Sequence, residues 1–356
     1  MPHLAAPAAI ALCLAAPLAH ALTVVFTPTG PVPPGADAVL AQASTYLASL
    51  FTDPVTIEIG IVFDEGGATF AIPTDVEIDY EIFRAALVDD MDADDWIQDF
   101  LPLSELPALV PTDATPAQVD RIVVPTAVAR AVGLAAPGSA GMITMGAEFD
   151  TDPSDGVDPD NFPMIDALIH EVGHIMGFAS YSIDFPGFEG LASPFDIFRF
   201  PADDGANDAN PDTPPEFTAR ARTLTAGLPA GGHVIDLVFA EFPAWDGSVV
   251  QASHLMFVDE QTSGVMAGIP LGSTLAPDYF RIADLAVLDA MGWDRAIGCS
   301  PADLAEPLGT LDFSDVLAFL TAFGAMDPAA DLADPEGVFD FSDVLAFLSA
   351  FATGCP

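Results

Sequence analysis

The sequence predicts an α+β fold for most of the chain, followed by a small all-α helical pair at the C-terminal end. Before residue 298, segments with helical and with strand periodicity follow one another irregularly, which is typical of an α+β protein. One expected helix contains H-E-V-G-H at residues 170–174, a spacing typical of metal ligands. Beyond residue 298, the stretch that begins at Asp303 recurs from Asp331, 28 residues later. We therefore expect two folded units, residues 22–297 and 298–356.

Residues 1–21 are predicted to be a secretory signal and not a part of the fold. Residues 4–18 are rich in Ala and Leu and carry no charge, and Ala-His-Ala at 19–21 fits a small-x-small cleavage site. A buried N-terminal helix is the alternative. No later stretch reaches about 18 uncharged apolar residues, so we expect no membrane span. The protein is therefore expected to be secreted or held at the cell surface.

The charge balance excludes several classes of partner. The chain has 53 acidic residues against 8 basic ones, and its formal net charge is −45. Such a charge argues against binding of nucleic acid or of an anionic membrane, and it is compatible with calcium loading or a saline habitat. Two cysteines, Cys299 and Cys355, remain after the signal. In an oxidising compartment we expect a disulfide between them, with two free thiols as the alternative.

The elements before the site helix follow from their periodicity. Residues 22–35 contain a stretch rich in Pro and Gly, residues 27–35, which is expected to be a loop. Residues 37–51 have the apolar spacing of a helix, and residues 55–63 alternate as in a strand. We interpret residues 142–145 as an edge strand beside the substrate. The other expected elements are helices at 80–88 and 92–100, a strand at 118–124 and a short helix at 126–134.

Residues 164–178 are expected to form the amphipathic helix that carries the site. His170 and His174 are four residues apart and lie on one helix face, so both imidazoles can reach one metal ion. Glu171 can stand beside that metal and accept a proton from water without acting as a ligand. Gly177 follows at a position where helices commonly end. A chance match in an ordinary helix is the alternative.

A catalytic zinc usually has three protein ligands, and the third is not local here. In the compact pattern H-E-x-x-H-x-x-G-x-x-H, the third histidine would fall at position 180, which is Ser180. On spacing alone, either His233 or His254 could complete the site. A separate acidic loop at residues 150–160 carries five carboxylates, and calcium binding and simple solvation are equal alternatives for it.

The stretch H-E-V-G-H-I-M-G-F at residues 170–178 resembles metzincin metalloproteases of the leishmanolysin type. In those proteins the third histidine lies far downstream and is followed by a methionine turn and a short apolar helix that ends in Gly-Trp. This chain has the same order in three segments: Ser253-His254, residues 263–266 (Ser-Gly-Val-Met) and residues 282–293. It is still more similar to secreted bacterial metalloproteases with Q-A-S-H after an inserted segment, which is 202–233 here. Pro194–Phe200 also resembles their D-x-F-R segment.

This resemblance covers residues 36–295 and implies a site and a fold. The zinc ligands would be His170, His174 and His254, with Glu171 as general base and Met266 under the site. The fold would be a twisted mixed sheet with an active-site helix, followed by a mostly helical C-terminal subdomain.

The repeat at residues 298–356 resembles a dockerin-like module, in which two loop–helix units bury their apolar faces against each other. Its loops are similar to half of an EF-hand and could hold calcium, although Ala305 and Ala333 replace the usual third ligand. A purely apolar hairpin closed by the disulfide is the alternative. The resemblance implies a cohesin-like or cell-surface partner. The candidate calcium ligands are Asp303, Asp312, Asp315, Asp331, Asp340 and Asp343.

The sequence thus predicts a secreted zinc endopeptidase that cleaves a protein or peptide substrate and docks through its C-terminal module. The alternatives are a non-catalytic, calcium-ordered adhesion or scaffold protein with a vestigial metal site, and a metal-dependent hydrolase of another bond. Glu171 favours catalysis, because a site that only binds a metal does not need a base beside it.

Overall fold

The structure is a computed structural model. The ranges that it describes are 22–64, 67–91, 95, 97–104, 106–107, 118–146, 149–150, 162–180, 192–198, 228–230, 233–235, 254–255, 264–267, 279–296, 300–305, 311–326, 328–333 and 338–354. The predicted signal at residues 1–21, both cysteines of the expected disulfide and most of the acidic loop and of the inserted segment lie outside these ranges. Within them, no helix is long and apolar enough to cross a membrane.

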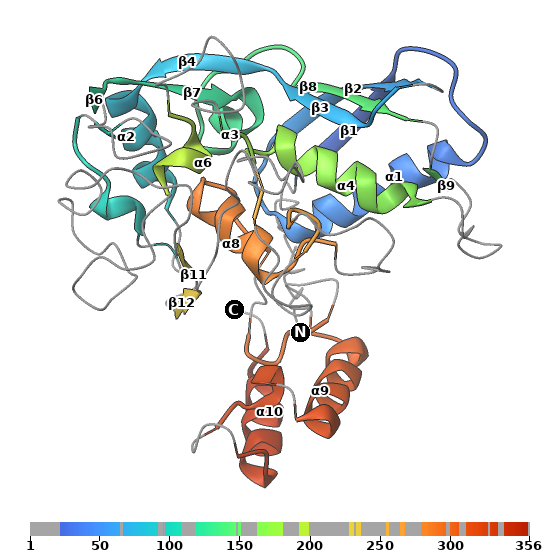
Figure 1. The fold of residues 1–356 in the computed structure, drawn as a ribbon. Coiled ribbons are helices and arrows are strands. Elements are labelled where there is room, and N and C mark those ends of the chain that lie inside the picture. Colours follow the sequence, from blue (N-terminus) through green and yellow to red (C-terminus); the bar gives the residue numbers. More distant parts are fainter. Residues whose placement is uncertain are drawn as a thin grey trace, which may run out of the picture.

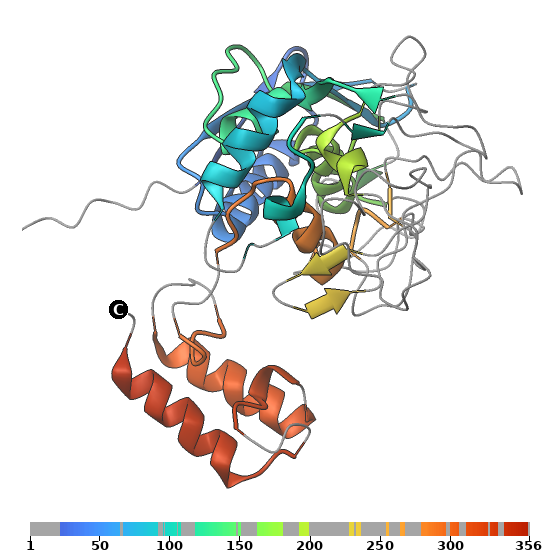
Figure 2. The same cartoon turned by 90° about the vertical axis from the view of Figure 1, so that its left-hand side faces the viewer.

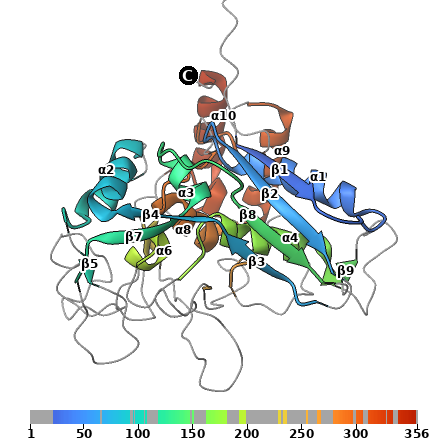
Figure 3. The ribbon, with the colours of Figure 1, turned by 90° about the horizontal axis from the view of Figure 1, so that it is seen from above.

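The described residues form a mixed α+β fold built on a four-stranded sheet with the order β1-β2-β8-β3 (Figures 1 and 3). The first three strands are parallel, and the edge strand β3 runs antiparallel to β8. Helices α1 and α4 contact the sheet strands and each other. These elements are β1 (Thr23–Pro28), α1 (Ala36–Leu50), β2 (Thr56–Phe63), β3 (Phe70–Pro73), β8 (Gly141–Met145) and α4 (Met164–Ile175).

Two expectations about this sheet were wrong. Residues 23–28 form β1, so the first two residues of the loop expected at 27–35 belong to a strand, because pairing with β2 extends through Pro28. The strand at residues 141–145 is not at the edge, since β3 pairs with its outer side. Phe70–Pro73 is only four residues long and ends in proline, so the sequence alone gives it almost no strand signal.

A second group of elements extends the fold beyond this sheet. Strands β4 and β7 form an antiparallel pair, and α2 and α3 lie beside them (Figures 1 and 3). Within the expected helix at 92–100, the described residues Ile97–Phe100 form a short 3-10 helix, η1. The other elements are β4 (Asp75–Asp79), α2 (Tyr80–Asp90), β5 (Leu106–Pro107), β6 (Gln118–Val119), β7 (Arg121–Pro125), α3 (Thr126–Ala131), β9 (Phe149–Asp150), β10 (Phe162–Pro163), α6 (Pro194–Ile197), β11 (Leu228–Ala230), β12 (His233–Ile235) and α8 (Ile282–Ala290).

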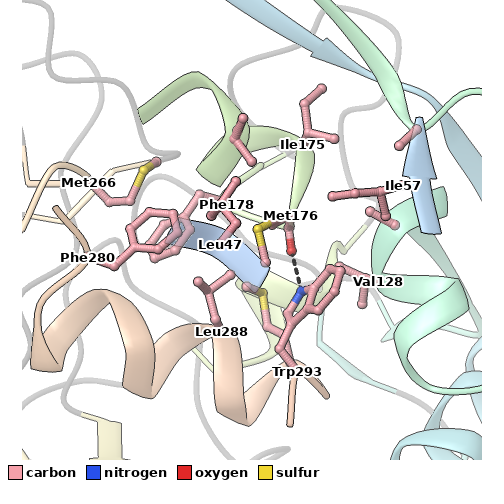
Figure 4. Packing of buried hydrophobic residues seen from close by; sticks show 14 of the residues in the cluster. Leu47, Ile57, Val128, Ile175, Met176, Phe178, Met266, Phe280, Leu288 and Trp293 are labelled. Carbon is pink, nitrogen blue, oxygen red and sulfur yellow. Dashed lines mark hydrogen bonds between the residues drawn. The ribbon is translucent and has the colours of Figure 1, made fainter. Parts of the chain in front are cut away.

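One hydrophobic core connects the sheet, the site helix α4 and α8. The alternation expected for β2 is present, since Ile57, Ile59 and Ile61 are completely buried. Trp293, three residues after the end of α8, is buried against this core and donates a 2.8 Å hydrogen bond from Nε1 to the carbonyl of Met176 (Figure 4). The Gly-Trp segment therefore fixes the C-terminal end of the site helix.

The C-terminal repeat forms two helices with a core of their own. Helices α9 (Phe313–Ala325) and α10 (Phe341–Thr353) lie side by side (Figures 1 and 2), and the rings of Phe319 and Phe347 stack with centroids 4.2 Å apart. This arrangement agrees with the pairing expected from the repeat. A short 3-10 helix, η3 (Pro328–Ala330), contacts α9.

Asp53 is a carboxyl group in the core region, where its burial disfavours the charged form. Its side chain is 1% exposed, and its Oδ1 has no hydrogen-bonding partner among the described residues. Its Oδ2 accepts a 3.0 Å hydrogen bond from the backbone N–H of Asp294. Burial, and next the charge of Asp294, raise the pKa of Asp53 to about 8. Because the folded-state pKa lies above the unfolded one, the protein is most stable with Asp53 protonated.

We therefore expect the free energy of unfolding to fall as pH rises from about 4 through about 8. The substitution Asp53→Asn should remove part of this loss of stability. Asparagine keeps an oxygen for the Asp294 N–H but carries no charge. At pH 8.5 the variant should be more stable by about 1 kcal/mol or more, a melting temperature about 2–4 °C higher. Thermal melts between pH 4 and 9 check this, with the exposed Asp37→Asn as control. Parallel pH profiles for Asp53→Asn and the wild type would contradict the assignment.

Candidate metal centre

Helix α4 presents the two histidines of the motif from a buried position. Ten of its twelve residues are buried, which explains why this helix is apolar on nearly all sides. The chain leaves the helix at Gly177, whose φ of 132° is rarely open to other residues. A side chain at this position would also approach Met291 to 2.8 Å. The helix-ending role expected for Gly177 thus has a steric cause.

The structure brings His254 to the two histidines of α4. The Nε2 atom of His170 lies 3.2 Å from Nε2 of His174 and 3.1 Å from Nε2 of His254. Tetrahedral zinc with bonds of about 2.0–2.1 Å places its nitrogen ligands about 3.3 Å apart. Among the described residues, these three histidines form the group of potential metal ligands whose ligand atoms all lie within 4.8 Å of one another.

Backbone carbonyls set the tautomers of two of these rings. Nδ1 of His170 lies 2.6 Å from the carbonyl oxygen of Val265, and Nδ1 of His174 lies 2.6 Å from that of Phe178. Carbonyl oxygens only accept hydrogen bonds, so each Nδ1 donates and each Nε2 keeps a lone pair. Burial lowers the pKa of both imidazoles and keeps them neutral. Lone pairs that face each other at these distances fit a cation held between them, and the residues present therefore fit zinc.

Met266 lies directly against the site helix, as expected for the methionine turn. It is completely buried, and a Cβ at Gly173 would come within 2.3 Å of its Sδ (Figure 4 shows Met266 beside the core). Gly264 also allows a close approach, since a Cβ there would meet Oδ2 of Asp284 at 1.9 Å. The two glycines let the turn pack closely enough for the Val265 carbonyl to reach His170.

We expect Gly173→Ala to be destabilising, although alanine normally favours a helix by about 1 kcal/mol over glycine. The new methyl group would overlap Met266, and such overpacking typically costs about 1–3 kcal/mol. The substitution should also weaken zinc binding, because it pushes the turn away from His170. Gly324→Ala in α9 is the matched control, since a Cβ there meets nothing within 4 Å and should be neutral or stabilising. Equal melting temperatures for Gly173→Ala and the wild type would contradict this packing.

Glu171 lies between the two histidines in sequence and is nearly buried, with 6% of its surface exposed. Its carboxylate accepts a hydrogen bond from the backbone N–H of Ala71 on the edge strand β3, while its Oε2 has no partner among the described residues. Burial raises the pKa of Glu171 to about 8. A cation at the histidines would oppose this shift, because a nearby positive charge favours the carboxylate.

Sequence reasoning missed the role of Ser180, which occupies the position of a third histidine in the compact pattern. Ser180 is buried and donates a 2.7 Å hydrogen bond to Oδ1 of Asp196, a residue of the segment that resembles D-x-F-R. The signal that could have revealed it is Asp196, an acid within an apolar segment. His233 lies in β12, but its side chain is outside the described part of the structure.

Two of the candidate calcium ligands of the repeat, Asp315 and Asp343, are engaged with the backbone. Oδ1 of Asp315 accepts hydrogen bonds from Leu304 N–H (2.8 Å) and Ala305 N–H (2.9 Å), and its Oδ2 accepts one from Asp312 N–H (2.7 Å). The second repeat has the same three bonds, in which Asp343 accepts from Leu332, Ala333 and Asp340. These carboxylates close the loops themselves. Calcium binding by the set of Asp303, Asp312, Asp315, Asp331, Asp340 and Asp343 stays a prediction.

Comparisons with family models, with curated proteins and with solved structures found no match to this chain. The functional argument therefore depends on the geometry of the site itself.

Proposed function

We propose that this protein is a zinc-dependent endopeptidase in which Glu171 is the general base. The observation that carries the proposal is the convergence of His170, His174 and His254 through their Nε2 atoms, with Glu171 next to His170 on the same buried helix. Three histidines with an open fourth position are typical of catalytic rather than structural zinc. The resemblance to leishmanolysin-type metzincins agrees with this assignment.

The residues of the site have separate tasks in hydrolysis. Bound zinc supplies Lewis acidity toward water and toward a carbonyl oxygen. His170, His174 and His254 would hold it, the first two with neutral imidazoles that the Val265 and Phe178 carbonyls orient. Oε2 of Glu171 accepts the proton of the attacking water and then delivers it to the nitrogen of the leaving amine. The Ala71 N–H holds the carboxylate at that place.

The edge strand β3 favours a peptide as the substrate over an ester or a glycan. It is the last strand of the sheet order, and its residue Ala71 contacts Glu171 through the backbone. Phe70 and Ile72 alternate with Ala71 along this strand and are 45% and 55% exposed. An extended peptide can pair with such an edge through its main chain, which places its carbonyl groups beside the site helix.

The test is hydrolysis of casein by the purified protein. We expect cleavage that stops on treatment with a zinc chelator and returns when zinc is added back. The second candidate function is a non-catalytic adhesion or scaffold protein, for which the repeat module is the specific observation. One equivalent of tightly bound zinc without hydrolysis of any peptide library would favour that candidate and contradict the peptidase.

The C-terminal pair supports docking to a partner protein. Each helix has three exposed apolar residues at the same positions of the repeat, and the chain has no Lys, Arg or His after Arg295. An acidic module with apolar stripes fits a cohesin-like or cell-surface protein whose apolar groove is bordered by basic side chains. The stripes are Phe313, Leu317 and Leu320 on α9, and Phe341, Leu345 and Leu348 on α10.

A further inference from the structure

The segment that leaves the site helix is joined to α6 by two adjacent contacts. The rings of Phe178 and Phe195 are 5.3 Å apart, and Ser180 donates its 2.7 Å hydrogen bond to Asp196. All four side chains are buried, with at most 1% of their surface exposed. Because the two contacts join neighbouring positions on both segments, they prevent one segment from sliding or twisting against the other.

The same segment orients a metal ligand. The carbonyl of Phe178 accepts the hydrogen bond from Nδ1 of His174 at 2.6 Å, two residues before Ser180. The turn that presents this carbonyl is tight, since Phe178 N–H donates to the carbonyl of Gly173 and Ala179 N–H to that of Gly177. A shift of residues 178–180 would therefore move the carbonyl and rotate the imidazole.

Helix α6 is itself held firmly, so it can serve as a fixed support. Asp196 accepts hydrogen bonds from Ser193 through the backbone N–H (3.1 Å) and through Oγ (2.9 Å), which caps the start of α6. Directly before the cap, the carbonyl of Ala192 accepts a 2.9 Å hydrogen bond from Val123 N–H in β7. An unbroken series of contacts thus runs from β7 through Asp196 and Ser180 to the ring of His174.

We propose that Asp196 and Ser180 are positioning residues of the metal centre, which set the orientation of His174 through the Phe178 carbonyl. This inference rests on the proposed zinc site. Ser180 occupies the place where a compact site would have its third ligand, and here the position supports a ligand instead. Partners that orient metal-binding histidines typically contribute about 10–100-fold to metal affinity.

The test compares two full-length variants that each lose one buried hydroxyl group. Ser180→Ala removes the bond to Asp196, and Tyr80→Phe removes the 2.9 Å bond from the Tyr80 hydroxyl to the carbonyl of Pro102, in α2 and away from the histidines. Both should melt about 2–4 °C lower in the zinc-free state. In competition with a chromophoric chelator, only Ser180→Ala should bind zinc about tenfold more weakly.

Cobalt in place of zinc gives a second readout, which a loss of stability alone would not change. The visible absorption bands of bound cobalt report ligand geometry, so they should shift in Ser180→Ala and stay unchanged in Tyr80→Phe. Asp196→Ala should weaken zinc at least as much, and the double variant should lose nothing further, because the pair acts as one unit. If Asp196→Ala does not fold, the comparison of Ser180→Ala with Tyr80→Phe is sufficient to test the positioning role.

The outcomes separate this inference from the proposed function. Equal zinc affinity and equal cobalt spectra in Ser180→Ala and the wild type would overturn the positioning role and leave the peptidase proposal standing. A wild-type protein that binds no zinc would overturn both.

Discussion

Glu171→Gln is expected to abolish peptide hydrolysis and to leave zinc binding intact. Glutamine has nearly the same size and can still accept the hydrogen bond from Ala71 N–H, but it cannot take a proton from water at neutral pH. Loss of a general base costs typically about 10²–10⁴-fold in rate. We therefore expect kcat/KM for a casein-derived peptide to fall by at least about 100-fold, with zinc content unchanged by elemental analysis.

The size of this effect follows from the isolation of the carboxylate. Oε2 of Glu171 is buried and has no hydrogen-bonding partner among the described residues, so it is available to accept the proton of the water. The control is Glu81→Gln, which removes an exposed carboxylate from α2 and should leave activity unchanged. Full activity in Glu171→Gln would exclude the proposed role and direct attention to another proton acceptor.

The parts of the site that lie close in sequence could be predicted from it. His170, Glu171 and His174 share one helix, and helical geometry alone places the two imidazoles on one face. The α+β class and the two helices of the repeat were likewise expected, because the apolar periodicity of α9 and α10 is local. For these elements, the residues that determine the structure lie within about four helical turns of one another.

The parts that depend on distant pairing could not be predicted. Strand β3 exists through its pairing with β8, about 70 residues further along, and its own four residues carry little strand preference. The bond from Ser180 to Asp196 likewise joins two segments whose approach is set by β7 and α6. On spacing alone, His233 and His254 were equal candidates, and the family resemblance chose between them before the structure placed His254 beside His170.

His254→Ala is the prediction with the largest expected effect on the metal. His254 contributes one of the three converging Nε2 atoms, 3.1 Å from that of His170. Two histidines and water form a much weaker zinc site, so we expect affinity to fall by more than the about 10–100-fold typical of outer partners. The matched variant is His233→Ala, which should bind zinc like the wild type.

The measurement is the rise in melting temperature on addition of zinc, read beside direct metal competition. A ligand that binds only the folded state stabilises it by RT ln(1 + [L]/Kd), about 2.7 kcal/mol at a hundredfold excess over Kd. The zinc-dependent rise should therefore be large in the wild type and in His233→Ala, and nearly absent in His254→Ala. The reverse pattern would transfer the third ligand to His233. In that case the metal site would no longer explain the hydrogen bond between the His170 ring and the Val265 carbonyl. Val265 lies in the turn that closes the site beside His254.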